Sequence, residues 1–254
     1  MRNYILSLLL SLFLLGCVSN NSGGGDPNTK EKLLMSGKNY QKLISFYKEQ
    51  LVKKEDKDTR IKLIEAYVEL GDFNSAIFYL EPLLKRQEIE YKVNLLAGKS
   101  YLNIGEIDRA LEYLGKANQQ QPTSAEVLNL LGISDCYKGN FYTAKQRFSQ
   151  ARIYMDDDLT VKNNLALVAI LQQHYFTAKD LLESLYYTGA QNDRRVRANL
   201  AIVYAKLGNR RAFSELAKGL TDEQQNQVFA RLKNMEVADV KGVVLGEKHE
   251  KSSK

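Results

Sequence analysis

The chain contains little proline, cysteine and histidine and no tryptophan. Its 254 residues include 3 Pro, 2 Cys and 2 His. Because proline is the commonest helix breaker, its scarcity favours helices, as does the abundance of Leu, Ala, Lys, Glu and Gln over clustered Val and Ile. With 44% hydrophobic residues, the chain is able to bury a continuous core. We therefore predict an all-α fold.

The sequence also lacks a recognisable catalytic or metal-binding pattern. His174 and His249 have no Cys, Asp or Glu at ligand spacing. No glycine-rich phosphate loop and no serine nucleophile follows a strand pattern. The acidic run 156–158 could suggest a cation site, but its place just before a predicted helix favours helix N-capping. We expect no enzyme, no cofactor, no metal and no small-molecule substrate.

The charges do not gather on one part of the chain. The 36 basic and 30 acidic residues give a net charge of +6 and are interspersed, apart from a short basic end at 248–254. A nucleic-acid site would need a basic stripe interleaved with aromatic residues. The pattern instead predicts an ordinary solvated surface and no nucleic-acid partner.

Residues 1–16 have the character of a signal peptide. Arg2 supplies the positive charge, and Tyr4–Leu15 is an apolar run that is too short for a comfortable transmembrane helix. The run ends in Leu14-Leu15-Gly16-Cys17, which resembles the lipobox of bacterial lipoproteins, where the Cys is acylated and the leader is cut before it. The alternative is an ordinary leader with an incidental cysteine, but a small residue directly before the Cys favours the lipobox.

The lipobox resemblance implies a lipidated Cys17 and a flexible tether over 17–29, because the polar segment after the Cys is too poor in apolar groups to fold. Several acyl chains would anchor the protein stably. By resemblance to the lipoprotein sorting pattern, Val18 in place of Asp implies the periplasmic face of the outer membrane. Cys136 then has no intramolecular disulfide partner, and we interpret it as a small apolar residue of a helix and not as a reactive thiol.

A 34-residue period runs through the rest of the chain. Turn-like positions fall at Gly71, Gly105, Gly139 and Gln173, and a fifth turn follows 35 residues later at Gly208. A glycine there ends the first helix of a hairpin with positive φ. Five residues on stands a small residue that lets two helices approach closely, and four further on a large apolar one; the small residues are Ala76, Ala110, Ala144 and Ala178. These spacings are typical of the tetratricopeptide repeat.

We predict a solenoid of five to six such hairpins over 30–220. Its ends depart from the pattern, as caps do: Leu43 and Phe213 stand where the small residue belongs. Thr221 and Gln224 have the spacing of a capping box, so a C-terminal capping helix is predicted over 221–236. Residues 237–254 are predicted to form a polar tail, whose short apolar island at 243–245 could dock in a groove.

In tetratricopeptide arrays, the first helix of each hairpin lines the concave face. Asn129 and Asn163 occupy equivalent positions there, and their amides could hydrogen-bond to the backbone of a partner peptide. The alternative is that this stripe packs on neighbouring repeats or on the tail. The predicted partner-binding groove consists of Asn129, Ile133, Tyr137, Asn163, Leu167, Ile170, Leu171, Ala198 and Ile202.

The combination of lipobox, tether and repeats, with the segment RRVRANLAIVYAKLG at 194–208, resembles the TadD lipoproteins of tight-adherence (Flp) pilus systems. Phe213 and the basic tail depart from that pattern. The resemblance implies a scaffold or pilotin that binds the outer-membrane secretin or other pilus-assembly proteins and supports adherence and biofilm formation. Two alternatives stay open, namely a type IV pilus secretin pilotin and an envelope adaptor for cell-wall hydrolases.

Overall fold

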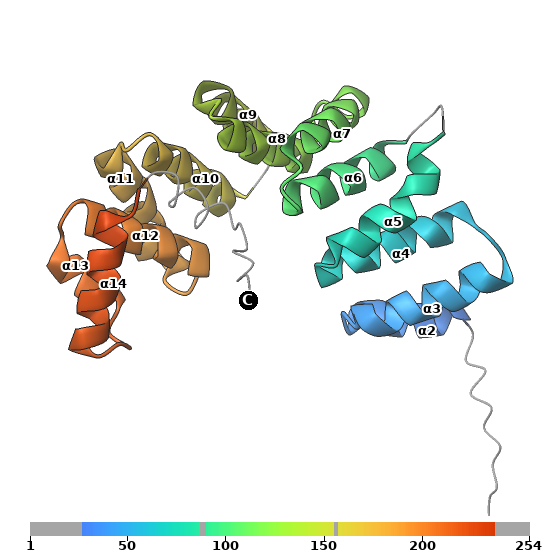
Figure 1. Ribbon diagram of the computed structural model, residues 1–254, viewed down its shortest axis with the longest axis horizontal. Helices are drawn as coiled ribbons and strands as arrows, with labels where there is room; N and C mark the ends of the chain where they lie inside the picture. Colours follow the sequence, from blue (N-terminus) through green and yellow to red (C-terminus); the bar gives the residue numbers. More distant parts are fainter. Residues whose placement is uncertain (1–26, 87–89, 155–156, 237–254) are drawn as a thin grey trace, which may run out of the picture.

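The computed structural model describes residues 27–86, 90–154 and 157–236, and within these ranges every regular element is a helix. Six helical hairpins follow one another and a single helix closes the array. Figure 1 shows them as an open arc with the first helices of the central hairpins on its inner side. The predicted all-α solenoid with a C-terminal capping helix is confirmed. The hairpins are α2 (Pro27–Ser36) with α3 (Tyr40–Lys53), α4 (Lys57–Leu70) with α5 (Phe73–Leu84), α6 (Tyr91–Asn103) with α7 (Ile107–Gln120), α8 (Ala125–Lys138) with α9 (Phe141–Ile153), α10 (Asp158–Leu171) with α11 (Tyr175–Leu185), and α12 (Arg194–Lys206) with α13 (Arg210–Leu216); α14 (Asp222–Asn234) follows.

The hairpin turns share one backbone conformation. Each has a residue with positive φ one or two positions after the end of its first helix, and four of these residues are glycines. Gln173 (φ 62°) and Lys38 (φ 49°) adopt the same left-handed conformation without being glycine. The hairpin therefore imposes the turn, and glycine only makes it easier to form.

The small residues of the repeat separate closely packed helices, as predicted. Ala76, Ala110, Ala144 and Ala178 are fully buried. A Cβ atom added at Gly98 would lie 2.5 Å from Cγ of Leu114, and one added at Gly132 would lie 2.5 Å from Cε1 of Phe148. Because protein cores are close-packed, a larger residue at any of these positions must displace its neighbours.

The single 35-residue interval has a local cause. From Ala151 to Val161 the chain advances ten residues, whereas between the equivalent core positions Leu185 and Val196 it advances eleven. The extra residue falls where α11 continues into a π-helical turn, Tyr186–Ala190, which contains Gly189 at φ 129°. The insertion is therefore absorbed between two hairpins, and the core register resumes in α12.

Both predicted helix caps that lie in the described residues are confirmed. Thr221 Oγ1 accepts a hydrogen bond from the Gln224 amide (3.3 Å), and the Gln224 side chain accepts one from the Thr221 amide (3.0 Å). Asp157 caps α10 by accepting a hydrogen bond from the Thr160 amide at 3.1 Å. The capping helix α14 packs on α12 and covers Phe213, whose ring centroid lies 5.1 Å from that of Phe229.

Several predictions concern residues outside the described ranges. They are the leader 1–16, the lipidation of Cys17, the tether up to residue 26 and the tail 237–254 with its apolar island. Cys136 lies within the described chain and is fully buried in α8, in agreement with its interpretation as a core residue.

Candidate partner-binding groove

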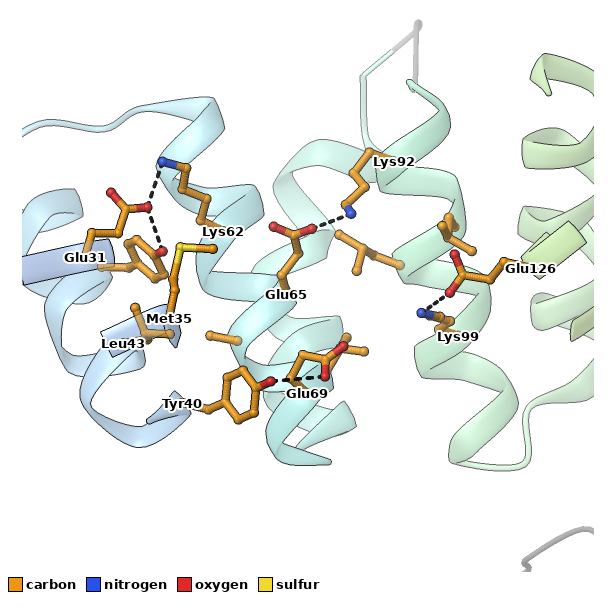
Figure 2. Close-up of a pocket in the computed structure, with 15 residues that line it drawn as sticks. Glu31, Met35, Tyr40, Leu43, Lys62, Glu65, Glu69, Lys92, Lys99 and Glu126 are labelled. Carbon is orange, nitrogen blue, oxygen red and sulfur yellow. Dashed lines mark hydrogen bonds and ion pairs between the residues drawn. The ribbon is translucent and has the colours of Figure 1, made fainter. Parts of the chain in front are cut away.

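A pocket of about 520 Å³ opens on the concave face of the N-terminal half, and we call it the concave pocket. Helices from the first four hairpins contribute to it, so no single repeat forms it alone (Figure 2). It is lined by Glu31, Met35, Tyr40, Leu43, Tyr47, Lys62, Glu65, Ala66, Val68, Glu69, Lys92, Leu95, Leu96, Lys99 and Glu126.

The floor of the concave pocket is apolar. Leu43, Leu95 and Leu96 are buried and belong to the continuous core of the N-terminal hairpins. Met35 is different, because 55% of its surface is exposed. Its side chain lies next to Leu43 over the floor (Figure 2). An apolar side chain from another molecule could thus remove Met35 from water, which is favourable.

The rim of the pocket carries charges of both signs, arranged as ion pairs between the first helices of successive hairpins. Lys62 Nζ on α4 lies 2.8 Å from Glu31 Oε1 on α2. Further ion pairs join Lys92 on α6 to Glu65 on α4, and Lys99 on α6 to Glu126 on α8 (Figure 2). These pairs are partly exposed to solvent, so each contributes modestly to stability. The rim therefore stays hydrated and polar above the apolar floor.

Glu31 lies at the centre of the N-terminal part of this network. It accepts hydrogen bonds from Lys62 Nζ (2.8 Å) and from the Tyr47 hydroxyl (2.9 Å). Burial opposes ionisation of Glu31, but these two hydrogen bonds and the charge of Lys62 outweigh it and hold the pKa of the carboxyl below its ordinary value. Burial, and next the contact with Glu31, raises the pKa of Tyr47. At neutral pH the pair is therefore a carboxylate and a neutral phenol.

The concave pocket has the chemistry of a protein-binding surface. An apolar floor can take side chains from a partner, and a rim with both signs of charge can select them. Among the residues that the structure describes, no group of three or more His, Cys, Asp or Glu side chains could hold a metal ion. Within the same ranges, no helix is both long and apolar enough to cross a membrane.

Comparison with known proteins agrees with the spacing and the geometry. A family model described as tetratricopeptide repeat matches residues 67–133. The fold is a tetratricopeptide-repeat solenoid. The match begins at the end of α4 and ends within α8, and it includes the pocket residues that α6 and α8 contribute. A search of curated protein sequences found no match to this chain.

Solved structures with the same fold come from several bacteria. A tetratricopeptide-repeat protein of Parabacteroides merdae is 13% identical, with a TM-score of 0.64 over 87% of this chain and 88% of that one. A thermophilic protein with this repeat from Thermus thermophilus is 17% identical (TM-score 0.56; 70% and 97% covered). The pilF protein of Pseudomonas aeruginosa is 22% identical (TM-score 0.54; 74% and 87% covered). At these identities the likeness shows the fold alone.

The groove predicted from the sequence lies further along the array than the concave pocket. Asn129, Ile133 and Tyr137 are half-buried on α8, and Ala198 is exposed on α12. The other five predicted residues have at most 4% of their surface exposed and contact neighbouring helices in the core; they are Asn163, Leu167, Ile170, Leu171 and Ile202.

Asn129 and Asn163 each accept a hydrogen bond from an asparagine of the following repeat. Asn164 Nδ2 donates to Asn129 Oδ1 at 2.6 Å, and Asn199 Nδ2 donates to Asn163 Oδ1 at 3.0 Å. Each bond joins the first helices of two successive repeats. In this structure the amides therefore pack on neighbouring repeats, which is the alternative considered from the sequence. A role for all of the predicted groove residues in binding a partner stays a prediction.

The residues of the concave pocket were missed, although the repeat carried a signal for them. Counting back 34 residues from Ile133 gives Lys99, and a further 34 gives Glu65. In the same way, Leu95 stands one repeat before Asn129. The prediction followed apolar residues and so favoured α8, α10 and α12. Apolar residues are frequent on these three helices because the hairpins pack against each other there. Charged residues instead line the concave pocket.

Proposed function

We propose that this chain is a protein-binding scaffold that holds a segment of a partner protein in the concave pocket. The observation that carries the proposal is the pocket itself, which combines an apolar floor with a rim of mixed charge across four successive hairpins. A partner segment that crosses these helices would bury Met35 and meet Lys62, Lys92 and Glu126 at the rim. Both the apolar floor and the paired charges suit a peptide chain better than a small polar substrate.

We further propose that the scaffold is a lipoprotein anchored through Cys17 to the periplasmic face of the outer membrane, where it acts in assembly of the tight-adherence (Flp) pilus secretion apparatus. The lipobox at 14–17 and the resemblance of 194–208 to TadD lipoproteins support this assignment. The partner would then be the secretin or another pilus-assembly protein. The fold likeness to pilF of P. aeruginosa is compatible with a pilus function and adds no residue-level support.

The pocket is tested by capture of the purified secretin on the immobilised mature protein. Met35→Glu places a carboxylate over the apolar floor and should weaken capture about tenfold or more, because contact with the partner would desolvate that charge. Leu33→Glu is a matched control on the same helix, since Leu33 is 71% exposed and does not line the pocket. Circular dichroism should show equal helicity for both variants.

The outcomes distinguish two parts of the proposal, namely the binding site and the identity of the partner. Equal capture by wild type and by Met35→Glu would contradict binding in the concave pocket. If the wild type captures no tight-adherence secretin, the same assay with a type IV pilus secretin and with cell-wall hydrolases tests the two alternative partners. In that event the pilus assignment is wrong, whereas the scaffold proposal depends on the Met35→Glu result with the new partner.

The anchor is tested separately in cells. Labelled palmitate should enter the wild-type protein and not Cys17→Ser, which should accumulate as an uncleaved precursor away from the outer membrane. Incorporation of label into Cys17→Ser would show that the lipid is not attached at Cys17.

A further inference from the structure

A second hollow, of about 220 Å³, is lined by residues of the π-helical turn, of α12, of α13 and of the turn between these two helices. Helices α12 and α13 lie at the opposite end of the arc from α2 and α3 (Figure 1). We call it the tyrosine hollow because three tyrosine rings line it. The complete lining is Tyr186, Tyr187, Tyr204, Asn209, Arg211, Ala212, Glu215 and Leu216. None of these residues lines the concave pocket.

The three rings are held in place by contacts with the protein. Tyr186 and Tyr187 meet edge to face, with ring centroids 5.3 Å apart and planes at 88°. Tyr204 is buried, and its hydroxyl donates a hydrogen bond to Glu183 Oε1 at 2.9 Å. Burial, followed by Glu183 and Tyr187, raises the pKa of Tyr204, so its phenol stays neutral. Tyr187 is 70% exposed and thus offers its ring to another molecule.

Two of the lining tyrosines, Tyr186 and Tyr187, stand in the irregular turn at the extra residue of this repeat. The π-helical turn Tyr186–Ala190 accommodates that residue, and π-turns occur frequently at functional sites. Thr188 Oγ1 donates to the carbonyl of Ser184 at 2.6 Å and so satisfies a backbone group of the irregular turn. One repeat earlier, Arg152 and Ile153 occupy the positions of Tyr186 and Tyr187. The paired tyrosines are therefore specific to this hairpin, as is the irregular turn that carries them.

The polar groups of the hollow favour a neutral ligand with free carbonyl groups. Glu215 forms an ion pair with Lys218 at 2.6 Å, and Arg211 further lowers the pKa of its carboxyl. The lining itself carries one positive side chain, Arg211, and one negative side chain, Glu215, so a strongly charged ligand of either sign gains little. The Arg211 guanidinium in the lining has several N–H donors that ligand carbonyl groups could accept from. Aromatic rings together with such a donor fit a chain whose carbonyl groups are unpaired.

We propose that the tyrosine hollow binds a proline-rich segment of a partner protein in the polyproline II conformation. Such a segment has no internal hydrogen bonds, so its carbonyl groups are free to accept from Arg211. Its proline rings pack flat on aromatic side chains, and aromatic-lined grooves recognise proline-rich segments for this reason. Because the segment is already ordered before binding, it loses little conformational entropy. This site is separate from the concave pocket and does not depend on its function.

The test is titration calorimetry of the full mature protein with a blocked ten-residue peptide of repeated Pro-Pro-Ala. We expect saturable binding that Tyr187→Ala weakens by about tenfold, the loss typical of removing one well-packed aromatic contact. Tyr142→Ala is the matched control, because Tyr142 is 76% exposed on α9 and does not line the hollow. Its affinity should equal that of wild type.

Two further measurements complete the test. A peptide of the same length with alanine in place of proline should bind at least tenfold more weakly. Met35→Glu should leave binding of the proline-rich peptide unchanged, which separates this site from the concave pocket. The proposal is overturned if the wild type shows no saturable binding, if Tyr187→Ala and Tyr142→Ala behave alike, or if the alanine peptide binds as tightly as the proline-rich one.

Discussion

The two halves of the solenoid join their first helices by different chemistry. In the N-terminal half, lysine and glutamate side chains cross from each first helix to the next. In the C-terminal half, asparagine amides take over this role between α8 and α10 and between α10 and α12. The charged junctions surround a pocket of about 520 Å³, whereas the amide junctions lie among buried apolar side chains.

The difference shows how one repeat can form either an open or a closed concave face. Charged side chains are costly to bury, so a junction that uses them keeps contact with water. Neutral amides that satisfy each other can be buried among leucine and isoleucine. The backbone repeat is the same in both halves, because the turn residues and the small alanines recur in both. The side chains of the first helices therefore decide which part of the concave face keeps contact with water.

The largest loss of stability is expected at the buried alanines, a feature that both halves share. Ala110→Phe in the N-terminal half and Ala144→Phe in the C-terminal half should each lower the free energy of unfolding by about 1–3 kcal/mol or more, because both alanines are fully buried between closely packed helices. Urea denaturation measures the change, with Ser149→Phe on the exposed side of α9 as the control. An unchanged midpoint for Ala144→Phe would contradict the close helix packing, and a loss in only one half would show that the two cores differ.

A smaller loss of stability should differ between the two halves, because their first helices are joined by different side chains. Asn163→Ala leaves the buried amide of Asn199 without its acceptor and should cost about 1–3 kcal/mol of stability. Lys92→Ala removes one partner of a half-exposed ion pair and should cost at most about 1 kcal/mol. Thermal unfolding of the two variants under the same conditions measures the difference. Equal losses would mean that the junctions do not differ in energy as their burial suggests.

The same asparagines also distinguish folding from binding. If Asn129 and Asn163 contact a partner backbone, the double variant Asn129→Ala with Asn163→Ala should lose capture while keeping its stability. The hydrogen bonds to Asn164 and Asn199 favour the opposite result, in which stability falls and capture changes only with the folded fraction. Thermal unfolding and partner capture measured on one preparation decide between the two.

The smallest effect concerns pH and should be confined to the charged half. The folded-state pKa of Glu31 lies below its ordinary value of 4.5, so its contribution to stability is complete above that pH and is lost as the pH falls through the folded-state pKa. Wild type should therefore exceed Glu31→Gln in stability near neutral pH by less than about 1 kcal/mol, and the difference should shrink below about pH 4.5. A difference that grows on acidification would contradict the assignment. Asn163→Ala should show no comparable pH dependence, because amides do not titrate in this range.

The sequence predicted the fold because the repeat is recorded in residues with strong local requirements. Gly71, Gly105 and Gly139 mark turns that need positive φ, and Ala144 marks a place where helices touch. The 35-residue interval was visible too. The structure that accommodates the extra residue could not be predicted, because an extra residue can form a loop, a bulge or a π-turn. Only the packing of Leu185 and Val196 on their neighbours selects one of these.

The candidate site was harder to predict than the fold. An apolar residue on a first helix, such as Leu167, serves equally well as a groove surface or as core, and sequence periodicity does not tell the two apart. The lysines and glutamates of the concave pocket looked like ordinary solvated charge in the sequence. Their meaning depends on which helices lie side by side, since Glu31 and Lys62 are 31 residues apart and meet only after the hairpins stack.

The concave pocket has a consequence for the cooperativity of the whole molecule. Across the described part of the chain, each hairpin packs mainly on the hairpins next to it, so each can fray with little effect on distant ones. The pocket, however, is lined by α2, α3, α4, α6 and α8 together. A segment bound there acts as a splint across four hairpins, and its binding energy stabilises all of them at once. Occupation of the pocket would thus join these four hairpins into one unit that opens together, while the two hairpins after them keep only contacts with their neighbours.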